Sequence, residues 1–452
     1  MARVLFCEYS NITWLNEQMF DAHAEAFINA LVDEGNDVLG IVTNHIVMSL
    51  YSNKLRWWFI ENKIRDIVNR FKPELILTYN NSLPGNDILS YTDCPILVYP
   101  ADVFDIWADK ELIEKNIDRY YFLDVTSKVT ERLKKAIPNI KPNQIIPFGH
   151  ATGVYAKDIE QDINISFVGS LCNYASNIPY YFSNLNKELD PEKANEEKAK
   201  FIKLYDRHMK DSSSVEGYEF LYCNDEIRKK LEKTLNYELD TMLSCNKRFK
   251  ILSALTEYGL EIFGYPPSWG AVMVYDLDLF RCFNYHTSVT LSDTIRTYNR
   301  SKVVLNLPQG TSTDGFSWRV PDVLASNAAL MSVPKMDLIH LMKPYCKDYP
   351  YYESIIEAKE LARKLTNNEN YRMELVLASH EMVEDNLRFP KKIKNISQAI
   401  PSIQLYKCTS TGKSNCFTVN ELCVPYMRIE EFFGKHSYLS KLCKTIYKKF
   451  NQ

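Results

Sequence analysis

The chain has 452 residues, with 54 lysines and arginines against 57 aspartates and glutamates, a formal net charge of −3. At roughly 150 residues per domain, this length predicts two or three domains. The balanced charge argues against a dedicated nucleic-acid-binding protein, which usually carries a basic excess. Hydrophobic residues make up 46% of the chain, which excludes a wholly disordered protein, and with only 14 glycines we expect no glycine-rich phosphate loop.

The cysteines and the N-terminal residues favour the cytoplasm. The 11 cysteines are irregularly spaced and form no C-x-x-C motif, so we expect buried thiols in a reducing compartment rather than disulfides or a zinc site. The first residues lack the apolar core and cleavage site of a signal peptide. No run of 18 apolar residues occurs, so we expect no segment that spans a membrane.

The first part of the chain, about residues 1–155, alternates short apolar runs with amphipathic stretches. The expected strands are Val4–Cys7, Asp37–Thr43, Leu75–Tyr79, Pro95–Tyr99, Tyr120–Leu123 and Gln144–Pro147, and the expected helices are Glu17–Leu31 and Arg56–Phe71. Continuous apolar strands separated by helices predict a parallel sheet covered on both faces, as in doubly wound α/β domains. We therefore expect an N-terminal Rossmann-like domain.

The same alternation restarts after residue 160. The expected strands are Ile163–Val168, Leu260–Phe263, Val303–Leu307 and Ala329–Val333, and the expected helices are Asn246–Tyr258, Ser292–Arg300, one that begins near Val320, and Glu353–Leu387. A charged stretch at about 185–234 reads as a helical insertion. The sequence thus predicts a second Rossmann-like domain over 160–400, with the carboxyl ends of both sheets facing a shared cleft.

The segment Tyr298–Ser332 carries the strongest functional pattern. An apolar strand ends in a polar loop that contains Asp314, and a helix begins near Ser317–Val320. Backbone N–H groups at such a helix start, together with Arg319, favour an anion. Asp322 is placed to accept hydrogen bonds from a ribose, although an aspartate near a helix start is also a common cap.

This segment resembles the signature of group-1 GT-B glycosyltransferases, most closely the branch around the CgeB-like spore-maturation proteins. The matching residues are Leu305, Asn306, Ser312, Thr313, Asp314, Gly315, Phe316, Arg319, Asp322 and Ala325. Asp314 and Asp322 stand where the family has two glutamates, and both side chains are one methylene shorter. The resemblance implies a GT-B fold and hexosyl transfer from a nucleoside diphosphate sugar, with no metal and no organic cofactor.

The resemblance extends upstream, where Ile165–Ser170 is similar to the first strand and turn of the family's donor domain. It implies that the donor is bound by Gly169, Ser170, Arg248, Tyr265, Tyr298, Gly315, Phe316, Arg319 and Asp322. Negative charge builds on the diphosphate as the anomeric C–O bond breaks, so fixed cations and backbone amides must stabilise it. The resemblance therefore makes Arg248 and Arg319 the candidate cations, with Asp314 and Arg319 among the catalytic candidates.

An inverting transferase also needs a general base, whereas a retaining one does not. We expect this base in the N-terminal domain, in a loop at the carboxyl end of a strand. Asp102, which follows the strand Pro95–Tyr99, is the first candidate. The other candidates are Glu8, His23, Asp105 and His150, each of which has a purely structural alternative.

Three alternatives compete with this reading. The run Ala271–Asp278 ends in D-x-D, so Asp276 and Asp278 are candidate Mn²⁺ or Mg²⁺ ligands of a GT-A enzyme. A non-catalytic nucleotide-sugar- or glycan-binding protein of the same fold is favoured by the shortened Asp314 and Asp322. An NAD-dependent oxidoreductase is disfavoured, because no G-x-G-x-x-G follows the first strand.

The C-terminal residues 403–452 form a basic tail with eight lysines and arginines against three glutamates. Apolar residues recur every four positions on one face of the expected helix, and lysines line another face. The apolar residues are Tyr438, Leu442, Ile446 and Phe450, and the lysines are Lys441, Lys444 and Lys448. This pattern fits contact with an anionic membrane or packing on the protein body. We expect a cytoplasmic enzyme of polysaccharide biosynthesis, with a nucleotide-sugar donor and a glycan or lipid-linked acceptor as partners.

Overall fold

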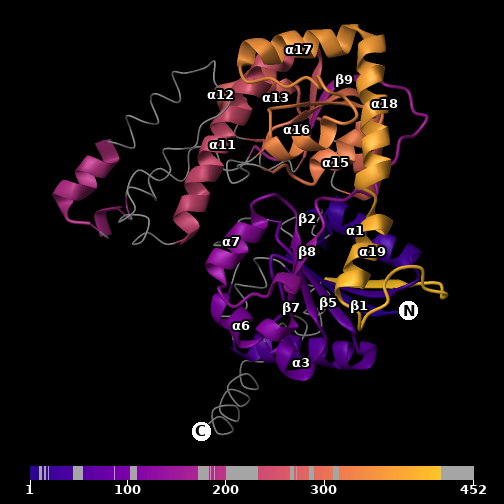
Figure 1. Cartoon of the computed structure of the whole chain (residues 1–452). Coiled ribbons are helices and arrows are strands. Elements are labelled where there is room, and N and C mark those ends of the chain that lie inside the picture. Colours follow the sequence, from indigo (N-terminus) through magenta and orange to yellow (C-terminus); the bar gives the residue numbers. More distant parts are fainter. Residues whose placement is uncertain are drawn as a thin grey trace, which may run out of the picture.

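Short continuous apolar runs form two separate parallel sheets, one in each lobe of the computed structural model (Figure 1). The structure describes residues 1–9, 13–14, 17–18, 20–43, 54–85, 87–101, 109–171, 183, 185–187, 189–199, 233–264, 269–270, 272–284, 290–308 and 315–418. Two parallel sheets with helices between their strands confirm the predicted α/β class with two Rossmann-like units.

The sheet of the lower lobe has seven strands in the order β13-β4-β1-β5-β6-β7-β8, and all of its pairings are parallel. Its strands are β1 (Arg3–Tyr9), β4 (Asp37–Thr43), β5 (Leu75–Tyr79), β6 (Ile96–Tyr99), β7 (Tyr120–Asp124), β8 (Ile145–Pro147) and β13 (Ser414–Thr418). Every residue of β5 and β6 is buried, as expected for central strands covered on both faces.

The helices of this lobe are α1 (Ala22–Asp33), α3 (Lys54–Phe71), α4 (Ile88–Tyr91), α6 (Lys110–Lys115) and α7 (Val129–Ala136). The prediction that the first helix begins at Glu17 is wrong. Glu17–Gln18 forms strand β3, which pairs with β2 (Thr13–Trp14), and α1 begins only after Asp21. The Asp21 side chain accepts a hydrogen bond from the N–H of Ala24 at 2.9 Å and so caps the helix there.

The sheet of the upper lobe has four parallel strands in the order β10-β9-β11-β12. Its strands are β9 (Ile163–Val168), β10 (Leu260–Phe263), β11 (Ser301–Asn306) and β12 (Ala329–Ser332). Its helices are α11 (Lys233–Leu255), α12 (Val272–Tyr275), α13 (Leu277–Arg281), α14 (Leu291–Arg300), α15 (Arg319–Leu324), α16 (Met336–Met342), α17 (Ile355–Asn367) and α18 (Glu369–Asn386). Helices α14, α15 and α17 contact strands of this sheet.

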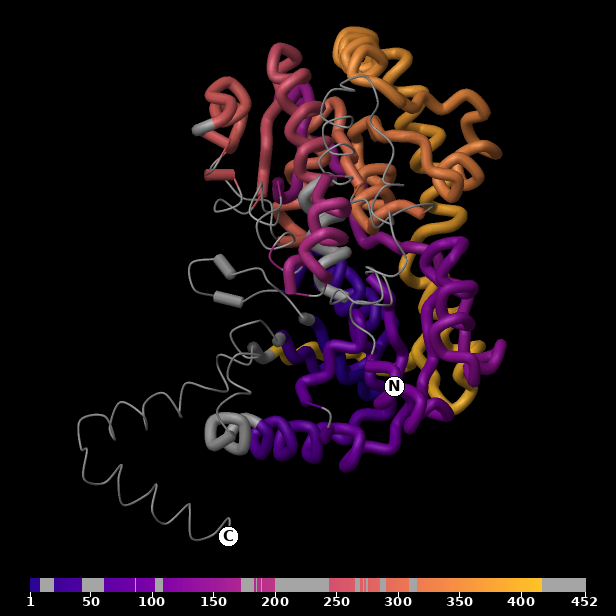
Figure 2. The backbone as a smooth tube through the Cα atoms, turned by 90° about the vertical axis from the view of Figure 1, so that its left-hand side faces the viewer, coloured from indigo at the N-terminus to yellow at the C-terminus, as the bar shows by residue number. Residues whose placement is uncertain are grey.

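The chain passes between the lobes twice. The first crossover joins β8 to β9, and the second leads from α18 into α19 (Phe389–Ala399), which contacts α1 and β8 of the lower lobe. Figure 2 shows α18 and α19 descending from the upper to the lower lobe along one side of the molecule. The sequence pattern did not predict that residues up to 399 pack on the N-terminal domain.

The predicted C-terminal tail contains one described element, β13, which adds a parallel strand beside β4. The helix expected around Tyr438–Phe450 lies outside the described residues, as does most of the predicted insertion at 185–234. Within that insertion, residues 185–187 and 191–199 are helical. Among the described helices, none combines the length and apolar character needed to cross a lipid bilayer.

Candidate functional site

The turn after β9 forms the base of the candidate site. The N–H of Gly169 donates to the carbonyl of Phe263 at 2.8 Å, and the indole N–H of Trp269 donates to the carbonyl of Gly169 at 3.1 Å. A β-carbon at position 169 would lie 3.0 Å from Nη2 of Arg319 and 3.2 Å from the Phe167 ring. Glycine therefore lets a guanidinium group approach this turn closely.

Arg248 of α11 connects the ends of two neighbouring strands. Its Nη1 donates to the carbonyl of Ser170 at 2.8 Å, and its Nε and Nη2 donate to the carbonyl of Leu307 at 3.2 and 3.0 Å. These carbonyls follow β9 and β11. The side chain is buried, and its guanidinium carbon lies 6.0 Å from the centre of the Phe167 ring. The hydrogen bonds fix a positive charge at the carboxyl edge of the sheet.

Arg319, the first residue of α15, brings a second cation to the same ring. Its guanidinium carbon lies 5.6 Å from the centre of Phe167, and its charge interacts favourably with the side chain of Tyr298 on α14. Burial lowers the pKa of Arg319, and the positive charge of Arg248 lowers it further. Two like charges thus lie close together, an arrangement that an anion would relieve.

Asp322 lies one turn further along α15 and points to the first crossover. It is 4% exposed, and its Oδ1 accepts a hydrogen bond of 2.6 Å from the hydroxyl of Thr152. Burial raises the pKa of Asp322 to about 7, although the bond from Thr152 favours the ionised form. The carboxyl group that the sequence assigned to a ribose therefore has a protein partner in this structure.

The segment between β11 and α15 also reaches the lower lobe. The Trp318 ring stacks on His23 with centres 5.0 Å apart and planes 16° apart, and Phe316 packs against His150 at 5.5 Å. A β-carbon at Gly315 would lie 2.2 Å from Cγ2 of Thr126. The described residues between β11 and α15 thus contact the carboxyl edge of the first sheet, and the two lobes meet there.

Three candidate bases lie at this edge, and all three are buried. Burial raises the pKa of Glu8 well above its usual range, and the neighbouring carboxyl of Asp21 raises it further. Burial lowers the pKa of His23 well below its usual range and that of His150 to about 4. Both imidazoles are therefore expected to be neutral at pH 7.

The imidazole rings of His23 and His150 are each hydrogen-bonded to a tyrosine hydroxyl. Nδ1 of His23 lies 2.7 Å from the hydroxyl of Tyr79, at the end of β5, and Nδ1 of His150 is hydrogen-bonded to the hydroxyl of Tyr99, at the end of β6. The strand ends thus fix both ring orientations. Sequence reasoning did not identify these tyrosines as partners, because each lies more than 50 residues from its histidine.

Four of the residues predicted for the site lie outside the described residues: Tyr265, Asp102, Asp105 and Asp314. The other predicted donor residues are described. Gly169, Ser170, Arg248, Tyr298 and Arg319 come together at the ends of β9 and β11, whereas Gly315, Phe316 and Asp322 lie where the lobes meet.

The D-x-D alternative does not have the expected geometry. The run 271–278 is not a strand that ends in two metal ligands, because α12 and α13 occupy it. Asp276 caps α13 by accepting from the N–H of Leu279 at 2.9 Å, and Asp278 forms an ion pair with Arg281 at 2.8 Å. Across the described part of the chain, no three histidine, cysteine, aspartate or glutamate side chains gather as a metal-binding group.

One comparison with known proteins overlaps this site. Residues 247–397 match a family model described as Glycosyl transferase-like. This match covers about a third of the chain and includes both Arg248 and Arg319. No protein with a curated function matches the chain.

Several solved structures are similar in the arrangement of their elements. Anabaena HepE, in a complex with UDP and glucose, is 9% identical with a TM-score of 0.46, over 89% of this chain and 100% of its own. T4 phage BGT, with UDP and Mn²⁺, is 9% identical with a TM-score of 0.44, over 88% and 99%. MnaA of S. aureus, with UDP, is 10% identical with a TM-score of 0.42, over 89% and 98%. At these TM-scores, none of the three likenesses assigns a function to this chain.

Proposed function

We propose that this chain is a glycosyltransferase that moves a hexose from a nucleoside diphosphate sugar to a glycan or lipid-linked acceptor of a surface polysaccharide. The observation that carries the proposal is the pair of guanidinium groups, Arg248 and Arg319, over the same Phe167 ring at the carboxyl ends of β9 and β11. The family match over residues 247–397 supports it, because both arginines fall within it.

The chemistry of the pair suits a diphosphate. Two neighbouring cations, one with a pKa lowered by burial, have an unfavourable electrostatic energy that a bound dianion would reverse. The same positive charge would stabilise the leaving diphosphate as its oxygen takes the electron pair of the anomeric C–O bond. Arginine keeps its charge across the physiological pH range. We therefore propose that donor activation uses fixed cations and requires no metal or organic cofactor.

The acceptor is proposed to enter from the first domain. Asp102 and Asp314 keep their proposed catalytic roles, Asp102 as the general base of an inverting reaction. We place the reaction in the cytoplasm at the inner face of the membrane, where the basic tail 403–452 would contact anionic lipid. Sedimentation with anionic vesicles, with and without residues 424–452, tests this placement. Equal sedimentation of the two chains would contradict it.

A panel of nucleoside diphosphates and their sugar derivatives tests the function. We expect at least one nucleoside diphosphate to raise the melting temperature, because a ligand that binds only the folded state stabilises it. The matching sugar donor, incubated with glycan and lipid-linked acceptors, should then release free nucleoside diphosphate. If no member of the panel binds, the proposal is wrong.

A second function is a non-catalytic nucleotide-sugar-binding protein of the same fold. The observation that favours it is the bond between Asp322 and Thr152, which engages a carboxyl group expected at the donor. Binding of the donor without release of nucleoside diphosphate, with every acceptor of the panel, would identify this alternative.

A further inference from the structure

Asp322 and Arg319 lie on the same short helix, but their side chains contact different parts of the protein. They are three residues apart on α15, so their side chains are about one helical turn apart. Arg319 contacts the ring of Phe167 in the second sheet, whereas Asp322 bonds the hydroxyl of Thr152 in the first crossover. Helix α15 therefore joins the cationic site to the connection between the lobes.

Thr152 in turn joins the two crossovers. Its N–H donates to the carbonyl of Leu387 at 2.9 Å, and it forms an isolated parallel bridge with Arg388. Its hydroxyl also accepts from the N–H of Val154 at 3.0 Å. Thr152 is 1% exposed, so its hydroxyl bond to Asp322 lies in the protein interior. A buried hydrogen bond of this kind is costly to break on one side only.

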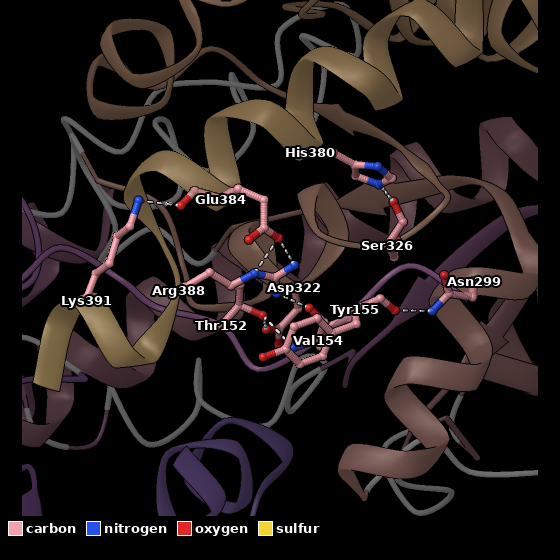
Figure 3. A network of polar contacts seen from close by, with 10 residues as sticks. All are labelled: Thr152, Val154, Tyr155, Asn299, Asp322, Ser326, His380, Glu384, Arg388 and Lys391. Atoms are coloured by element: carbon pink, nitrogen blue, oxygen red, sulfur yellow. Dashed lines mark hydrogen bonds and ion pairs between the residues drawn. The ribbon is translucent and has the colours of Figure 1, made fainter. Parts of the chain in front are cut away.

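Arg388 strengthens the junction from the second crossover, as Figure 3 shows. Its Nε donates to Oε1 of Glu384 at 2.7 Å, its Nη1 donates to the carbonyl of Val154, and its guanidinium carbon lies 4.1 Å from the centre of the Tyr155 ring. One arginine thus binds α18 and two residues of the first crossover. Hydrogen bonds therefore join the two crossovers to each other, and another joins the first crossover to α15.

Two further hydrogen bonds hold elements of the upper lobe beside this junction. Nδ2 of Asn299, on α14, donates to the carbonyl of Tyr155 at 3.0 Å (Figure 3). Nε2 of His380, on α18, lies 2.7 Å from the carbonyl of Ser326, just beyond α15. The end of α15 is therefore held against α18, and among the described residues the Asp322–Thr152 bond is the side-chain hydrogen bond between α15 and the first crossover.

We propose that the Asp322–Thr152 hydrogen bond is a positioning contact, which sets the orientation of the donor site relative to the acceptor domain, and that Asp322 does not bind the donor's ribose. This inference rests on the proposed function for its kinetic consequence. The contact itself is tested without any substrate. Asp322 is faced by Asp21 of the first domain, by Arg319 of its own helix and by Arg388 of the second crossover.

The substrate-free test is a double-mutant cycle on Thr152→Val and Asp322→Ala. Valine keeps the shape of threonine but cannot donate. We expect the effects on the unfolding equilibrium constant to be non-additive by tenfold or more, because each variant breaks the same bond. Additive effects would show that the two side chains are not energetically coupled and would overturn the proposal. This result does not depend on whether the protein transfers a sugar.

The kinetic test compares Thr152→Val with Thr152→Ser. We expect the valine variant to bind nucleoside diphosphate within twofold of wild type while its kcat falls at least tenfold, and we expect serine to restore kcat. A valine variant with wild-type kcat, or one that loses nucleotide affinity together with kcat, would overturn the positioning role. If the wild-type protein binds no nucleotide, the proposed function is wrong. The double-mutant cycle then remains the test of whether Asp322 and Thr152 are coupled.

Thr130→Val provides the matched control. Thr130 Oγ1 donates to Oδ2 of Asp124 at 2.9 Å, a threonine–aspartate bond of the same kind that lies within the first domain. We expect this variant to have wild-type kcat and nucleotide affinity. A fall in kcat as large as that of Thr152→Val would show a general effect of lost stability and would overturn the proposal.

Discussion

Replacement of Arg319 by methionine should separate stability from binding. Methionine keeps much of the apolar length of the side chain but removes its charge. The wild-type protein holds Arg319 in a desolvated position beside Arg248, and interactions with Tyr298, Asp322 and the Phe167 ring offset part of this cost. We therefore expect the free energy of unfolding without ligand to change by less than about 1 kcal/mol, since relief of charge repulsion offsets the lost interactions with Tyr298 and Phe167.

The effect on nucleoside diphosphate binding should be much larger. One guanidinium facing a diphosphate makes one or two charge-assisted hydrogen bonds of about 1.5–3 kcal/mol each. Their loss should weaken binding by about 2–4 kcal/mol, or roughly 30- to 1,000-fold in Kd. Isothermal titration calorimetry measures the affinity, and urea unfolding measures the stability.

A surface arginine of the same domain controls for the loss of charge alone. Arg300 pairs with Asp162 through Nε at 2.8 Å and lies outside the cationic site. Arg300→Met should bind the nucleotide within about threefold of wild type, because exposed ion pairs contribute little. An Arg319→Met protein that binds equally well, or one that loses binding only because it unfolds, would refute the assignment of Arg319 to the diphosphate.

Three further predictions concern pH, packing and metal. Because the pKa of Asp322 is raised to about 7, the folded state binds more protons than the unfolded state between about pH 4 and 7, and stability falls as pH rises through that range. Asp322→Asn should remove up to about 4 kcal/mol of this dependence in urea unfolding, and an unchanged pH profile would contradict the burial of the carboxyl. Gly315→Ala should cost about 1–3 kcal/mol, because its β-carbon would lie 2.2 Å from Cγ2 of Thr126, and a wild-type urea midpoint would contradict that contact. Transfer activity should survive EDTA, and Asp276→Ala should lower stability by about 1 kcal/mol through the lost cap on α13 without changing kcat. Activity that EDTA abolishes and Mn²⁺ restores would contradict the metal-independent proposal.

Most strands could be predicted from the sequence, because buried parallel strands are continuous apolar runs. The expected runs Asp37–Thr43, Leu75–Tyr79 and Ile163–Val168 coincide with β4, β5 and β9. Strand β13 could not be found in this way. Its described side chains at residues 414–416 are exposed, and backbone pairing with β4 defines it. A short polar strand at a sheet edge has no periodic signal.

The candidate site was predicted in part. The resemblance placed Gly169, Arg248 and Arg319 in one site, and the structure brings them together around Phe167. The partner of Asp322 could not be predicted, because Thr152 is 170 residues away and belongs to no motif. Such contacts depend on how two domains pack, which local sequence patterns do not encode.

The return of the chain to the first sheet has a consequence for biosynthesis. β4 lies between β1 and β13, and Sγ of Cys416 would lie 2.8 Å from a β-carbon at Gly40, so the last strand packs closely on this part of the sheet. On the ribosome, β4 has an uncovered edge until residue 418 has emerged, long after the other six strands. An uncovered edge strand can pair with other chains. The N-terminal domain is therefore translated first but gains its seventh strand only after the second domain has been translated, and a chain that stops before Ser414 keeps this edge exposed.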